Sequence, residues 1–211
     1  MACIFHDSVS HKIGVPVFLE NDAKCAGLAE KCFGVGQAFQ DFVYLTFGTG
    51  IGGVVFSKGK IHYGSQGLAG EIGHMTLYPK GESCTCGNLG CFERYCSATE
   101  NKLSAKEILL LFENSPGSES QVMDQFIDDL SIGIGSLMTL LNPQAIVFSG
   151  GLFKSGGGKI LPAVKKKLST QGFQSMKSNV QLLHSPLHGK AGVLGAATLT
   201  RADFDLETPL K

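Results

Sequence analysis

Four side chains of the types that bind transition metals crowd into one short stretch of the sequence: His74, Cys84, Cys86 and Cys91. Three thiolates and one imidazole are the donor set of a tetrahedral structural zinc site. Glycines between and beside these residues allow the backbone to turn so that the donors converge. Because the protein would fill all four positions, no position remains for an activated water. The spacing therefore predicts a structural Zn²⁺, with a group of buried free thiols as the alternative.

The second ring nitrogen of His74 has a chemistry of its own. If one ring nitrogen binds zinc, the other carries the proton and can only donate, so it could hold a ligand hydroxyl. The remaining cysteines form no Cys-x-x-Cys motif, and we interpret them as ordinary buried thiols rather than redox centres. They are Cys3, Cys25, Cys32 and Cys96.

The hydrophobic pattern predicts the elements that position these residues. His11–Gly14 is typical of a last helical turn with a glycine cap. Val15–Leu19 predicts a strand and Ala23–Glu30 has a helical composition, so Asp22 lies at a predicted strand-to-helix junction. The runs that follow predict an antiparallel meander with a glycine-rich first turn, Gly48-Thr49-Gly50. Its strands are expected at Phe42–Phe47, Ile51–Ser57 and near Ile61–Tyr63.

Residues 64–97 have almost no hydrophobic periodicity, so their order must come from something other than apolar burial, and a metal is the obvious candidate. Beyond them, apolar spacing and glycine breaks predict further helices and strands. The helices are expected at Ser104–Phe112, Gln121–Leu141, around Leu161–Leu168 and at Ala191–Arg201, and the strands at Ala145–Phe148 and Val180–Leu183.

The composition is that of a globular protein. Of 211 residues, 43% are hydrophobic and 17% charged, which excludes intrinsic disorder. Eighteen Lys and Arg balance eighteen Asp and Glu, so nucleic-acid binding by the whole chain is not expected. Seven cysteines without a signal segment favour a reducing, cytoplasmic setting. The uncharged stretch Leu130–Phe153 is broken by Asn142-Pro143-Gln144 and by Ser149-Gly150-Gly151, so no membrane span is expected.

Two segments, Glu71–His74 and Cys84–Glu93, closely resemble the signature of the ROK family of sugar kinases and sugar-responsive repressors. Pro16–Ala23, Leu45–Gly53 and Ile146–Gly151 also resemble the family, in its order. The resemblance covers nearly the whole chain. It implies an α/β, actin- and hexokinase-like ATPase fold of the ribonuclease H-like type, a structural zinc and often a homodimer or homotetramer.

The resemblance also implies a division of the chain. Members of the family begin with a strand–turn–strand that carries an Asp-Gly-Gly-Thr type phosphate and magnesium site, and residues 1–20 do not resemble it. We expect residues 1–34 to be the remnant of the N-terminal ATPase half, its last strand and helix. Residues 35–211 are then the C-terminal half, with the zinc loop inserted at about 71–97. The final helix, at about 191–204, is expected to return to the N-terminal half, and the chain is expected to be a fragment or truncated product.

Asp22 matches the catalytic aspartate of the family, which takes the proton from a sugar hydroxyl as that hydroxyl attacks the γ-phosphate of ATP. The alternative is that Asp22 only caps the following helix. Other positions match the residues that hold sugar hydroxyls, although the two glutamates could instead be surface charges. The positions that match sugar-binding residues are Asn21, Glu71, His74 and Glu93.

Two glycine turns match the nucleotide-binding turns of the family. Gly48-Thr49-Gly50 corresponds to a turn whose backbone N–H groups approach the β- and γ-phosphates, and Gly150-Gly151 to the turn against adenosine. Each could equally be an ordinary tight turn. The implied activity is phosphorylation of a hexose by ATP with Mg²⁺. The alternatives are the sugar-sensing and dimerising module of a ROK repressor, although residues 1–20 contain no basic DNA-binding helix, or an inactive remnant.

Overall fold

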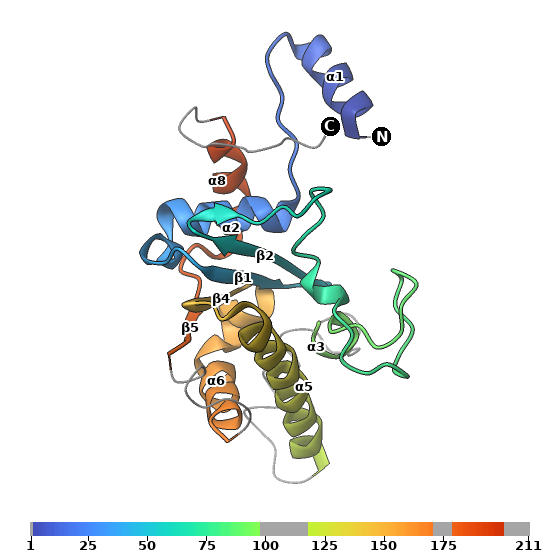
Figure 1. Cartoon of the computed structure of the whole chain (residues 1–211), viewed down its shortest axis with the longest axis vertical. Coiled ribbons are helices and arrows are strands. Elements are labelled where there is room, and N and C mark those ends of the chain that lie inside the picture. The colour runs from blue at the N-terminus through green and yellow to red at the C-terminus, as the bar shows by residue number, and fades with distance from the viewer. Residues whose placement is uncertain (1, 98–117, 171–178, 201–211) are drawn as a thin grey trace.

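The computed structural model describes residues 2–97, 118–170 and 179–200, and shows helices on both faces of one mixed sheet (Figure 1). The strand order is β3-β2-β1-β4-β5. The strands are β1 (Phe42–Phe47), β2 (Ile51–Ser57), β3 (Lys60–Ile61), β4 (Ala145–Ser149) and β5 (Gln181–His184). β1 pairs with β2 antiparallel and with β4 parallel, so it is the central strand. The predicted meander at 42–63 and the strand at 145–148 are confirmed.

The α-helices are α1 (Ala2–Ile13), α2 (Asp22–Phe33), α3 (Glu93–Cys96), α5 (Ser118–Leu141), α6 (Gly151–Leu168) and α8 (Ala191–Thr198). Short 3-10 helices lie at η1 (Val35–Ala38), η2 (Ile72–His74) and η3 (His188–Lys190). Gly14 caps α1 as predicted, with φ of 73° and its N–H donating to the carbonyl of Ser10. The predicted helix at 104–112 lies outside the described residues. No helix among the described residues is long and apolar enough to cross a membrane.

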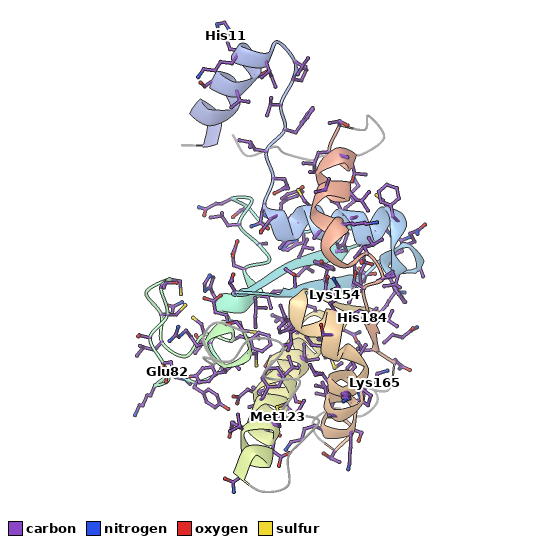
Figure 2. The ribbon with its side chains drawn as sticks, turned by 180° about the vertical axis from the view of Figure 1, so that it is seen from behind. His11, Glu82, Met123, Lys154, Lys165 and His184 are labelled. Carbon is purple, nitrogen blue, oxygen red and sulfur yellow. The ribbon has the colours of Figure 1, made fainter. Side chains whose placement is uncertain are left out.

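The larger core lies between the sheet and the pair α5 and α6. Alternate residues of β1 and β4 face this side, where the rings of Phe47, Phe148 and Phe153 pack together. Met123 of α5 and Lys165 of α6 mark the end of this layer farthest from His11 of α1 (Figure 2). Successive side chains of a strand point to opposite faces of the sheet. One set therefore packs against α5 and α6, and the other against α2.

The smaller core lies between the sheet and α2, and α8 covers α2 from outside (Figure 1). Two glycines make these contacts close. A Cβ on Gly27 would clash with Val54 of β2, and a Cβ on Gly195 of α8 would clash with the backbone carbonyl of Cys25. The backbone of α2 is therefore held between the sheet and α8. The division of the chain at residue 34 remains a prediction.

Two sequence predictions are corrected. Val15–Leu19 forms no strand: no described strand runs beside it, and Val15 and Phe18 are 55% and 49% exposed. A strand needs a hydrogen-bonded neighbour, which the hydrophobic pattern alone does not supply. The helix expected around Leu161–Leu168 starts earlier, at Gly151, and includes a run of glycines that brings it close to β5. A Cβ on Gly157 would lie 2.8 Å from the ring of His184, which belongs to β5 (Figure 2).

Candidate functional site

A cavity of about 310 Å³ opens where β1 ends, β2 begins and α2 starts. It brings together residues that are far apart in the sequence: Asn21–Ala23, Thr46, Gly48–Gly53, Glu71 and Glu93. Seven of the predicted site residues are among them: Asn21, Asp22, Gly48, Thr49, Gly50, Glu71 and Glu93. The cavity is mostly polar because backbone, amide and carboxylate groups provide its lining.

Asn21 and Asp22 divide two roles that the sequence left open. Asn21 is the N-cap of α2, with its Oδ1 accepting from the backbone N–H of Lys24 at 3.1 Å. Asp22 is the first residue of α2, and its Oδ1 accepts from the backbone N–H of Ala23 at 2.8 Å. The exposed Asp22 carboxylate thus lines the cavity at the start of a helix.

The glycines of β2 explain how the walls of the cavity come so close. A Cβ on Gly52 would lie 2.8 Å from Ala23, and a Cβ on Gly53 would lie 2.7 Å from Ile72. Glycines inside a strand pattern often mark such close approaches, and this was the signal that the sequence reasoning left unused. The lining residues that it missed are Ala23, Thr46 and Ile51–Gly53.

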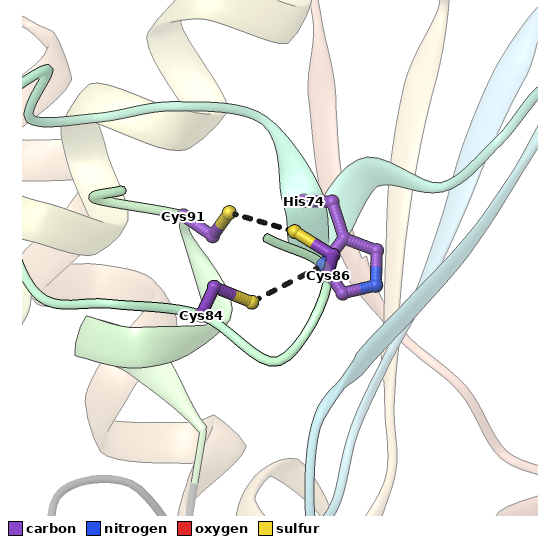
Figure 3. A group of neighbouring side chains, drawn as sticks. All are labelled: His74, Cys84, Cys86 and Cys91. Atoms are coloured by element: carbon purple, nitrogen blue, oxygen red, sulfur yellow. Dashed lines mark hydrogen bonds between the residues drawn. The ribbon is translucent and has the colours of Figure 1, made fainter. Parts of the chain in front are cut away.

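The predicted metal ligands converge. The ligand atoms of His74, Cys84, Cys86 and Cys91 all lie within 4.8 Å of one another. His74 Nδ1 lies 3.6 Å from Cys84 Sγ, and the sulfurs of Cys86 and Cys91 also lie 3.6 Å apart (Figure 3). Donors around a tetrahedral zinc with ordinary bond lengths are about 3.5–3.8 Å apart. The donor set and its spacing therefore fit zinc.

The thiols themselves point to a cation. Burial, followed by the neighbouring thiols Cys86 and Cys84, raises the pKa of Cys91 to about 12. Three thiolates so close together would repel one another, and a bound cation removes that cost. Figure 3 also shows that Nδ1 of His74 faces the sulfurs while its other ring nitrogen points away from them. A zinc-bound His74 would accordingly present an N–H on the side opposite the metal.

Glu93 lies between the metal ligands and the cavity. One carboxylate oxygen, Oε1, accepts from the Cys84 thiol at 3.3 Å and lies 3.5 Å from His74 Nδ1. The other, Oε2, is so close to Gly50 that a Cβ there would lie 2.8 Å from it. Glu93 begins the short helix α3, directly after the last cysteine of the cluster, and therefore connects the metal loop to the turn after β1.

Of the residues predicted to bind sugar or nucleotide, three are not part of the cavity lining: His74, Gly150 and Gly151. Gly150 has φ of 91° and lies against the backbone of Phe47, the last residue of β1. Because β1 and β4 are parallel, the turns that follow them meet at the same edge of the sheet. The two glycine turns that the sequence predicts to bind nucleotide are therefore neighbours.

An α/β sheet, an aspartate at a helix start and a histidine–cysteine cluster thus lie at or beside one cavity. The profile of the ROK family matches residues 3–203, and the chain belongs to the ROK family. The predicted family and fold class are confirmed.

Relatives of the chain include both kinases and repressors. The chain is 30% identical to a xylose repressor of Bacillus subtilis, over 93% of this chain and 53% of that protein. It is also 30% identical to a glucokinase of Thermotoga maritima, over 92% of this chain and 69% of that protein. The chain thus spans about half the length of the repressor and about two thirds of the kinase.

A solved structure shares the fold. The ROK glucokinase of Streptomyces griseus, determined in complex with glucose and AMPPNP, superimposes with a TM-score of 0.79 at 28% identity. The match covers 92% of this chain and 71% of that one.

Proposed function

We propose that this chain provides the sugar-binding and proton-accepting face of an ATP-dependent hexose kinase. The observation that carries the proposal is the cavity in which the Asp22 carboxylate, the Gly48–Gly50 turn and two further carboxylates share one space. The glucokinase of Streptomyces griseus binds glucose and an ATP analogue with the same fold, which supports both ligands here.

The residues divide the work by their hydrogen-bonding capacity. Glu71 and Glu93 accept from sugar hydroxyls, Asn21 offers amide groups, and the N–H of His74 that points away from the sulfurs donates. A mixed set of donors and acceptors is what a polyol requires. His74, Cys84, Cys86 and Cys91 would hold a structural zinc, which would fix the orientation of His74 and of the loop that ends at Glu93.

Phosphoryl transfer then needs a proton acceptor and a place for charge. Asp22 accepts the proton of the attacking hydroxyl, and the backbone N–H groups of Gly48-Thr49-Gly50 face the β- and γ-phosphates. Gly150-Gly151, on the neighbouring strand end, lies against adenosine. Mg²⁺ enters with ATP and offsets the negative charge of the phosphates.

A second function is supported by the xylose repressor, which matches nearly the same residues at the same identity as the glucokinase. In that function the cavity binds a sugar and the chain serves as a sensing module without phosphoryl transfer. Catalysis distinguishes the two.

The test is ADP release by the zinc-loaded chain with Mg-ATP and a panel of glucose, mannose, fructose, N-acetylglucosamine and xylose. We expect release that depends on one of these sugars and that falls at least about 100-fold in Asp22→Asn, because a positioned general base contributes roughly that factor or more. The variant keeps the size of the side chain. Equal rates in the two proteins would contradict the kinase. Sugar binding by calorimetry without ADP release would favour the sensing module.

A further inference from the structure

Lys24 is a buried cation next to the site that the proposed function does not use. It belongs to the first turn of α2 and is only 4% exposed. Its Nζ donates to the carbonyl of Gly67 at 2.5 Å and lies 5.2 Å from the centre of the Tyr63 ring. Within the described part of the chain Lys24 forms no ion pair. Its ammonium group therefore contacts a backbone carbonyl and the face of an aromatic ring.

Tyr63 ties the same loop to the residues just before Asp22. Its hydroxyl donates to Glu20 Oε2 at 2.8 Å, and Glu20 Oε1 accepts from the backbone N–H of Asn21 at 2.8 Å. Burial, followed by the bond to Glu20, raises the pKa of Tyr63, so its phenol remains a donor. Both sides of Asp22 are thus connected to the segment 63–67.

The segment 62–70 runs directly into Glu71, which lines the same cavity as Asn21 and Asp22. Its base is closed by the N–H of Ala69 donating to the carbonyl of Tyr63 at 3.0 Å. Its end is fixed to β2, since a Cβ on Gly70 would lie 2.9 Å from the carbonyl of Gly53. Apolar burial contributes little to holding this segment in place, because Leu68 is 62% exposed. The bond from Lys24 is the polar contact that holds the middle of this loop.

We infer that Lys24 is a positioning residue, which with Tyr63 and Glu20 holds loop 62–70 on the start of α2 and thereby sets how tightly the cavity grips a hydroxylated ligand. A methionine would fill much of the same space but leave the Gly67 carbonyl without its donor. The statement about the ligand rests on the proposed function; the statement about the loop does not.

Hydrogen exchange read by mass spectrometry on the intact chain tests the loop. In Lys24→Met we expect peptides that cover residues 62–71 to exchange at least about tenfold faster, because a hydrogen bond to a charged donor is lost. Lys31→Met is the matched control. Lys31 lies on the same helix and donates to the carbonyl of Phe39 at 2.7 Å, away from the cavity lining. Unchanged exchange at 62–71 in Lys24→Met would overturn the inference.

A second, milder variant keeps the inference testable if Lys24→Met does not fold. Tyr63→Phe keeps the ring under Lys24 and removes only the hydroxyl bond to Glu20, so a smaller acceleration of the same peptides is expected. Local exchange is used rather than thermal stability, because removing a buried charge also removes its desolvation cost and global stability can then change in either direction.

The ligand is tested with glucose as the probe, or with the sugar of the panel that drives ADP release. We expect Lys24→Met to raise KM about tenfold and to change kcat by less than about threefold. Asp22→Asn is expected to act mainly on kcat instead. Faster loop exchange with an unchanged KM would overturn the positioning role. Faster exchange in a chain whose wild type binds no sugar would support the holding of the loop and count against the proposed function alone.

Discussion

At the level of single residues, Asn21 and Asp22 show how neighbouring polar side chains divide their tasks. Helix capping and proton transfer both require a short oxygen-bearing side chain at a helix start, so the sequence alone left both open for Asp22. The structure gives the cap to Asn21, whose amide oxygen accepts from the N–H three residues ahead. The carboxylate next to it is then available to a ligand.

The metal site can be tested with one pair of buried thiols. Cys91 and Cys96 are both 0% exposed, but only Cys91 belongs to the cluster. We expect Cys91→Ser to lose zinc on dialysis while Cys96→Ser retains one ion per chain, because a hydroxyl is a much poorer zinc ligand than a thiolate. Elemental analysis of the dialysed proteins measures this. Full zinc content in Cys91→Ser would contradict the assigned ligand set.

Residues whose chemistry is local could be predicted, and those whose partners are distant could not. The convergence of His74, Cys84, Cys86 and Cys91 could be predicted because these residues and the glycines among them are contained in one short segment. Lys24 gave no such signal, since its carbonyl partner is 43 residues away and lysine in a helix is usually a surface residue. A loop carbonyl has no signature in a sequence.

At the level of elements, glycine was the residue that sequence reasoning interpreted least well. A run of glycines lowers the expected helicity, so the first half of α6 was missed. Their use is in packing: Gly157 allows α6 to lie against His184 of β5. The strands were easier to predict, because β1, β2 and β4 are bounded by turns and contain β-branched and aromatic residues.

The turn between β4 and α6 offers a paired test of backbone strain. Gly150 has φ of 91° and lies against the backbone of Phe47, whereas a Cβ on the next residue, Gly151, would meet nothing within 4 Å. We expect Gly150→Ala to lower the free energy of unfolding by about 1–3 kcal/mol and Gly151→Ala to leave it nearly unchanged. Urea denaturation compares them. Equal stabilities would show that the turn adopts another conformation.

At the level of the whole molecule, the sheet separates two cores, and alternate residues of β1 and β4 face each side. The sequence could not predict the order of the strands, because β4 joins β1 across about 100 residues. Long-range pairing of this kind depends on helices filling both faces at once.

Buried phenols and thiols make the stability of the molecule sensitive to alkaline pH. Burial raises the pKa of Tyr44 to about 12 from 10.0 and that of Cys25 to about 11 from 9.0. The pKa values of these groups are higher in the folded than in the unfolded protein. The stability that the two neutral groups contribute is therefore fully present below pH 9 and is lost as the pH rises through 9–12. Urea unfolding under reducing conditions at pH 8, 10 and 11 should show the decline, and Tyr44→Phe should lessen it above pH 10. A flat profile up to pH 11 would contradict this.

The contact of Gly195 with the backbone of Cys25 has a consequence for the order of folding. The helix that begins at Asp22 is completed on its outer side by α8, which comes about 170 residues later in the chain, and closing so long a loop is slow relative to forming local structure. During synthesis from the N-terminus, the meander of β1, β2 and β3 is made long before its covering is complete. The cavity can therefore acquire its final shape only after residue 195 has emerged from the ribosome.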